Sequence, residues 1–189
     1  MVNVKKLLRD IVEKYPSSAV VMMELPTESY FDVNIATVKF LIDREFEGIY
    51  ISFHRPFKNI LSLFEQHRID TNKLFFIDTA TALSKGTGEE NPRCIYISKS
   101  VDIDELIRAI YITLPKLKGR GRFIFIDSIT TIAIYKPLSE TMRFSEFLIR
   151  IVRKNEVENV IFNVARDLVQ KKFIRDIALR VDKVISVAE

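Results

Sequence analysis

Six short apolar runs recur along this chain, and longer segments with the apolar spacing of amphipathic helices separate them. The runs are rich in β-branched and aromatic residues and hold few polar positions. That pattern is typical of strands buried on both faces, and such strands belong to parallel sheets. The runs cover residues 19–25, 48–53, 73–78, 122–127, 159–164 and 182–187, with a shorter extended run at 94–98.

Helical spacing is found between the apolar runs, and this alternation predicts the architecture. The spacing predicts helices over residues 34–47, 57–67, 102–117, 140–154 and 167–179. Strands and helices in strict alternation form right-handed crossovers that cover both faces of one sheet. We therefore predict an α/β fold, a three-layer α/β/α sandwich with a mainly parallel central sheet.

Two segments fall outside this alternation. Residues 1–14 are amphipathic, and we expect a leading helix that packs on one edge of the domain. Residues 79–93 contain Gly86, Gly88 and Pro92, so we expect an exposed loop or insertion there.

Length and composition narrow the class of protein. The 189 residues fit a single domain over 1–189. One cysteine and two histidines argue against a disulfide framework and a structural zinc site, so we expect no metal and no cofactor.

No apolar run approaches the roughly 18 residues of a membrane span. The N-terminal segment carries acids, unlike a targeting peptide. We expect a soluble cytoplasmic protein, and its rich usage of Ile, Lys, Arg and Glu suits a thermophile.

Several segments, taken in order, resemble the RecA-like ATPases and most closely their KaiC-like branch. Residues 47–53 resemble the family's second strand, and 56–70 resemble the helix after it. Residues 123–130 read FIFIDSIT, which is similar to the Walker B strand with its terminal Asp-Ser. Residues 143–153 resemble the following helix. The resemblance implies a RecA-like core whose first strand sits centrally beside residues 159–164, with residues 122–127 on the far side of that strand.

The chain departs from this family where the phosphates of a nucleotide would bind. Residues 26–34 read PTESYFDVN, with no glycine to wrap a phosphate and no lysine to neutralise it. Glu28 and Asp32 add negative charge there. Aromatic residues stand in place of glycines, so we expect Tyr30 or Phe31 to pack at the phosphate position. The glutamates that the family places after its second strand are replaced by His54 and Arg55.

The resemblance and its departures together imply a degenerate nucleotide site. We expect no catalytic residue, and a vestigial set of nucleotide-binding residues: Thr27, Ser29, His54, Arg55, Asp127 and Ser128. Asp127 has two interpretations, since it either holds magnesium through water or caps the turn that it shares with Ser128. The leading hypothesis is a non-catalytic pseudo-ATPase that acts as a regulatory or scaffolding protein, through a protein partner or a homo-oligomer.

Two other functions stay open. The first is a nucleic-acid-binding RecA relative, because residues 95–189 carry 17 basic and 12 acidic side chains. Under this hypothesis the basic cluster at 116–122 contacts phosphates. The alternative is that the cluster is the end of a helix, where cations and glycine are favoured. The second is a divergent nucleotide-binding protein that uses His54, Arg55 and Asp127.

Two further residues are expected to have structural roles. Asp78 is expected to cap a turn, and Cys94 is expected to be chemically inert.

Overall fold

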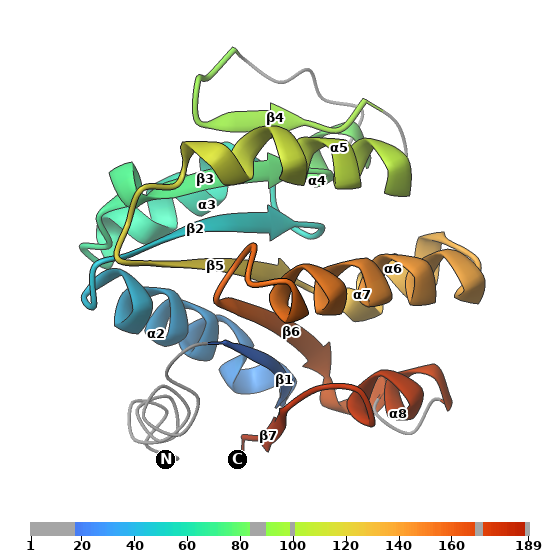
Figure 1. The fold of residues 1–189 in the computed structure, drawn as a ribbon. Coiled ribbons are helices and arrows are strands. Elements are labelled where there is room, and N and C mark those ends of the chain that lie inside the picture. Colours follow the sequence, from blue (N-terminus) through green and yellow to red (C-terminus); the bar gives the residue numbers. More distant parts are fainter. Residues whose placement is uncertain (1–17, 84–89, 99–100, 169–171, 188–189) are drawn as a thin grey trace.

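A seven-stranded, wholly parallel sheet forms the centre of the computed structural model, which describes residues 18–83, 90–98, 101–168 and 172–187. The strands are β1 (Ala19–Leu25), β2 (Phe46–Ser52), β3 (Leu74–Asp78), β4 (Cys94–Tyr96), β5 (Gly121–Asp127), β6 (Asn159–Ala165) and β7 (Lys183–Ser186). Their order across the sheet is β4-β3-β2-β5-β6-β1-β7 (Figure 1). All seven predicted extended runs are therefore strands of one parallel sheet.

Helices cover both faces of the sheet, which confirms the three-layer α/β/α prediction (Figure 1). On one face lie α2 (Tyr30–Ile42) and α3 (Phe57–Gln66). On the other lie α5 (Ile103–Thr113), α6 (Ile129–Tyr135), α7 (Leu138–Arg153) and α8 (Lys172–Ala178). Each face buries its own apolar cluster, and none of the helices in the described ranges has the length and apolarity that a bilayer crossing needs.

Short elements connect these layers. Four 3-10 turns occupy η1 (Thr27–Ser29), η2 (Thr71–Lys73), η3 (Leu114–Lys116) and η4 (Arg166–Leu168). The brief helix α4 (Ala80–Leu83) opens the segment 79–93, where an exposed loop was expected, and Thr79 and Ala80 are buried. Residues 84–89 and the expected leading helix at 1–14 lie outside the described residues.

The strand order confirms one topological prediction and corrects another. β1 pairs with β6, and β6 pairs on its other side with β5, as the resemblance implied. The first strand is not central, however: only β7 lies outside it, and β5 occupies the middle of the sheet. The buried middle strand is therefore the one that carries Asp127 at its end.

The observed helices differ from the predicted ranges in several places. The helix predicted over 102–117 ends at Thr113 and continues as the turn η3, and within the predicted range 167–179 the structure describes the turn η4 and the short helix α8. Helix α2 begins at Tyr30 rather than residue 34 and ends at Ile42, because Glu45 takes a left-handed conformation with φ of 65° and turns the chain into β2. Helix α6 was not predicted. Its sequence, ITTIAIY, is rich in β-branched residues that favour strands, and burial against the sheet holds it helical.

Candidate functional site

The carboxyl edge of the sheet holds a buried acid at the end of the middle strand. Asp127 has no exposed surface. One of its carboxylate oxygens accepts a hydrogen bond from the Tyr50 hydroxyl at 2.5 Å, and the other accepts one from the Tyr30 hydroxyl. Both oxygens of this carboxylate are thus occupied by phenols of the same chain. Asp127 does not cap the turn at Ser128, so that structural hypothesis is wrong.

The alternation of side chains along the strands explains this arrangement. Phe123 and Phe125 face the layer of α2 and α3, so Asp127, two residues further on, faces it too. Tyr50 of β2 lies opposite Phe125 in the register, and their rings stack at 5.2 Å. The length of the Tyr50 side chain carries its hydroxyl to the strand end, where Tyr30 arrives from the first turn of α2.

Burial changes the acidity of both phenols. Loss of hydration raises the pKa of Tyr50 and of Tyr30 well above their ordinary value, and the negative field of Asp127 raises both further. The phenols therefore stay neutral and remain hydrogen-bond donors across the physiological pH range. Neutral donors at both oxygens stabilise the carboxylate without a cation.

The turn after β1 leads straight into helix α2. Pro26 is extended, Thr27 to Ser29 form the turn η1, and Tyr30 opens the helix. No residue from 26 to 34 has a positive φ. This stretch therefore lacks the alternation of right-handed and left-handed residues with which a backbone cradles phosphate groups. Thr27 is exposed, and the Ser29 hydroxyl is buried without a hydrogen-bond partner among the described residues.

His54 and Ser128 form the second part of the edge. The His54 Nε2 atom lies 2.6 Å from the Thr131 hydroxyl and 3.3 Å from that of Ser128, and Ser128 contacts the Thr130 hydroxyl at 2.7 Å. His54 is exposed, whereas the three hydroxyl residues are buried. The imidazole therefore closes a buried hydroxyl cluster from the solvent side.

Arg55 packs on the helix that carries Tyr30. Its guanidinium lies 3.7 Å from the centre of the Phe31 ring, in a cation–π contact. The contact joins the end of β2 to the start of α2, directly beside the Tyr30–Asp127 bond. Of the six residues predicted for this site, the structure brings His54 and Ser128 into contact and leaves Thr27 facing solvent.

Tyr50 and Asn163 were not among the predicted site residues, although the sequence held an indication of both. Each is a polar residue flanked by buried apolar residues of its strand, and such groups need a hydrogen-bond partner. Asp78, in contrast, caps as predicted: its carboxylate accepts from the main-chain nitrogens of Phe57 and Thr81 at 2.7 and 2.9 Å. Cys94 is buried, and burial raises its pKa to about 12, as an inert thiol requires.

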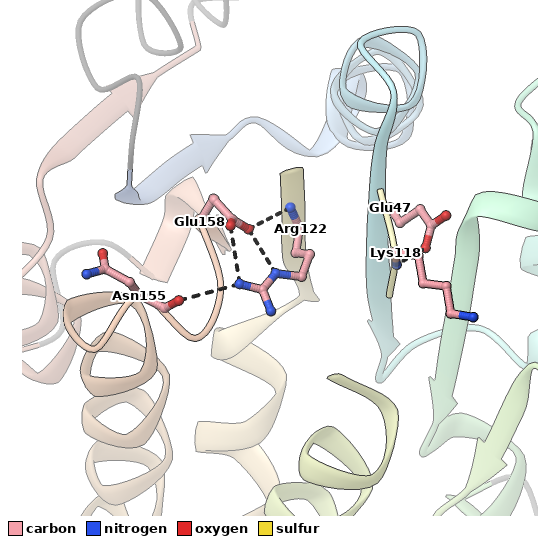
Figure 2. Close-up of polar contacts among 5 residues, drawn as sticks. All are labelled: Glu47, Lys118, Arg122, Asn155 and Glu158. Atoms are coloured by element: carbon pink, nitrogen blue, oxygen red, sulfur yellow. Dashed lines mark hydrogen bonds and ion pairs between the residues drawn. The ribbon is translucent and has the colours of Figure 1, made fainter. Parts of the chain in front are cut away.

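The basic cluster at 116–122 lies at the opposite, amino edge, where internal contacts use part of it (Figure 2). The Arg122 guanidinium and main-chain nitrogen both donate to the Glu158 carboxylate, at 3.2 and 2.7 Å. The main-chain nitrogen of Lys118 donates to Glu47 at 2.7 Å. This loop is therefore fastened to strand β2 and to the start of β6. No three histidine, cysteine or acidic side chains of the described ranges are grouped as metal ligands.

Comparisons with known proteins identify the fold. No family model matches the sequence, and no curated protein matches it. Among solved structures, the uncharacterized protein PH0321 from Pyrococcus horikoshii, crystallised with an unknown peptide, is 12% identical with a TM-score of 0.71, over 95% of this chain and 82% of its own.

Two further Pyrococcus horikoshii structures are similar. The KaiC-like protein PH0186 is 16% identical with a TM-score of 0.59, over 91% of this chain and 72% of its own. The protein PH0250 is 11% identical with a TM-score of 0.60, over 96% and 88%. The seven-stranded parallel sheet and its likeness to a KaiC-like protein together show that this chain has a RecA/KaiC-like α/β fold.

Proposed function

We propose that this chain is a non-catalytic RecA/KaiC-like protein that acts through contacts with other proteins, as a regulatory or scaffolding component. The observation that carries the proposal is the Tyr30–Asp127–Tyr50 cluster. Phosphoryl transfer depends on positioning and on charge stabilisation by a metal and a phosphate-binding loop. Here both oxygens of the one acid that matches the family's metal-binding position are occupied by phenols.

The turn after β1 supports the same proposal. A phosphate cradle needs successive main-chain N–H groups that converge on one point, which glycines with positive φ provide. Residues 26–34 have neither the glycines nor that conformation, and Tyr30 reaches across to Asp127. Glu28 and Asp32 are exposed near the positive end of α2, where acids stabilise a helix and where they would repel a triphosphate.

Exposed apolar side chains favour a role in protein contacts. Ile134, Tyr135 and Leu138 gather at the corner between α6 and α7 and are each at least half exposed, at 66%, 51% and 51%. Large apolar residues grouped on a surface are typical of interaction sites. Helix α6 connects this corner to Ser128 at the end of β5. The similar protein PH0321 was crystallised with a peptide, which is consistent with a binding role for this fold.

Nucleotide binding is tested by titration calorimetry with ATP and magnesium, together with a phosphate-release assay. We expect neither heat of binding at millimolar ATP nor hydrolysis above background. The Tyr30→Phe variant, which frees one Asp127 oxygen without new charge, is the matched control and should also stay inactive. Tight magnesium-ATP binding that Asp127→Asn abolishes would refute the proposal in favour of a divergent nucleotide-binding protein.

Protein contact is tested by light scattering over a range of concentrations, with the wild-type chain and the double variant Ile134→Ser/Leu138→Ser. Association that the wild type shows and the variant loses would support the proposal. A strictly monomeric mass together with a salt-dependent shift of DNA would favour nucleic-acid binding instead.

A further inference from the structure

Two basic side chains lie against the same aromatic ring at the amino edge of the sheet. Arg93 directly precedes β4, and its guanidinium lies 5.1 Å from the centre of the Phe75 ring. Lys116 ends the turn η3, and its ammonium lies 5.7 Å from the same centre. The two cations come from different segments of the chain, and the fold brings both to one ring.

Neither cation has an acidic partner among the described residues. Arg93 also donates to the main-chain oxygen of Leu74 at 3.5 Å, a group without net charge. The ion pairs formed within the described ranges all use other side chains. Since Arg93 and Lys116 carry like charges beside one ring, they repel each other, and a bound anion would relieve that repulsion.

The loop after Lys116 presents a further cation from a fixed backbone. The main-chain nitrogen of Lys118 donates to the Glu47 carboxylate at 2.7 Å, and that of Arg120 donates to the Glu45 carbonyl oxygen at 3.1 Å. The Lys118 side chain is exposed, and its ammonium points away from the Glu47 carboxylate (Figure 2). A fixed backbone reduces the conformational entropy that is lost when a ligand binds.

Apolar surface accompanies these charges. Ile112 is 52% exposed and comes four residues before Lys116, on the same side of the helix end. Phe75 is only partly buried where it packs on the core beneath α5. The surface therefore offers apolar contact together with positive charge, which is complementary to a segment that carries acidic and apolar side chains.

We propose that this surface docks an acidic segment of a protein partner. The surface, which we call the cationic edge, consists of Phe75, Arg93, Ile112, Lys116 and Lys118. Carboxylates of the partner bind its three cations, and apolar side chains of the partner pack on its isoleucine. The inference rests on the proposed role in protein contacts and gives one partner its chemical class.

The neighbouring part of the amino edge favours a short acidic segment over a nucleic acid. A hollow next to the loop is lined by Arg120 and Arg44, and also by three acids, Asp43, Glu45 and Glu158. A nucleic-acid backbone repeats its negative charge along its whole length and would meet these acids. A protein segment with a few carboxylates can end before them.

The test is fluorescence anisotropy with the full chain and a dye-labelled peptide of glutamates with interspersed leucines. We expect binding that weakens as sodium chloride is added, because salt screens exposed charges. The double variant Arg93→Ala/Lys116→Ala should bind about tenfold more weakly, since ion pairs at a surface each contribute modestly. The matched control Arg150→Ala/Lys154→Ala removes the same charge from two exposed residues at the end of α7 and should bind like the wild type.

Two further measurements keep the inference falsifiable. The variant Arg93→Glu/Lys116→Glu should lose the glutamate peptide and gain binding of a lysine–leucine peptide of the same length. Chemical-shift mapping on the ¹⁵N-labelled wild-type chain needs no variant, and it should place the bound glutamate peptide at Phe75, Arg93 and Ile112.

Three results would overturn the inference: no binding of the glutamate peptide, equal losses in the two alanine variants, or tighter binding of an oligothymidylate with the same charge. The last result would favour nucleic acid at this edge. None of them bears on the light-scattering test of Ile134 and Leu138, so failure of the cationic edge is distinguishable from failure of the proposed function.

Discussion

Removing the Tyr50 hydroxyl tests how strongly the buried acid depends on its phenols. The Tyr50→Phe variant keeps the ring and its 5.2 Å contacts with Phe64 and Phe125, so packing is unchanged. It deletes one 2.5 Å hydrogen bond to a fully buried carboxylate. Hydrogen bonds to charged groups contribute about 1.5–3 kcal/mol. We therefore expect the free energy of unfolding at pH 7 to fall by about 2 kcal/mol.

The measurement is urea unfolding followed by circular dichroism, with Tyr111→Phe as the control. Tyr111 is 48% exposed, so loss of its hydroxyl should change stability by less than about 0.5 kcal/mol. Tyr30→Phe should also lower the free energy of unfolding, because it deletes the hydrogen bond to the other oxygen of Asp127. The slope of the unfolding free energy against urea concentration should stay the same in all three variants.

The pH dependence gives a second readout of the same bond. The pKa of Tyr50 is raised in the folded state, so its contribution to stability is complete below the unfolded pKa of about 10 and is lost as the pH rises above it. The loss is about 1.4 kcal/mol per pH unit until the folded pKa is reached. The wild type should therefore lose stability faster than Tyr50→Phe above pH 10. Equal alkaline slopes and an unfolding free energy changed by under about 0.5 kcal/mol would refute this account of Asp127.

Three further predictions concern other parts of the fold. Asp78→Ala should lower the free energy of unfolding by about 2 kcal/mol, measured by urea unfolding, because three donors at the starts of α3 and α4 lose their acceptor. The control is Asp70→Ala, which removes an exposed cap and should lower the free energy of unfolding clearly less. Gly48→Ala should cost about 3 kcal/mol in the same assay, since its methyl group would lie 2.3 Å from the buried Phe123 ring, and a neutral effect would contradict that packing. Cys94 should resist alkylation by iodoacetamide at pH 8 and react once urea unfolds the chain, because burial raises its pKa to about 12; rapid labelling of the native protein would show that the strand edge opens.

The sequence was most informative where burial on both faces leaves a clear pattern. The strands of the parallel sheet and the neighbour relation of β1, β6 and β5 followed from apolar runs and from the resemblance around Asp127. Helix α6 was missed because β-branched residues mask helical spacing, and tertiary burial decides its conformation. The phenol cluster was missed because it joins residues from α2, β2 and β5. Pairing a polar residue with its distant acceptor needs the register of the strands, which sequence periodicity does not supply.

The position of β1 has a consequence for how the chain acquires its structure. Ala19 pairs with Asn159 on one side of β1, and Val21 pairs with Lys183 on the other. During synthesis the run AVVMMEL is therefore made long before either strand that covers its edges. Pairings this distant in sequence slow folding, and an apolar strand with open edges is prone to aggregate while it waits. A ribosome-bound chain that stops before residue 159 should accordingly depend on chaperones to stay in solution.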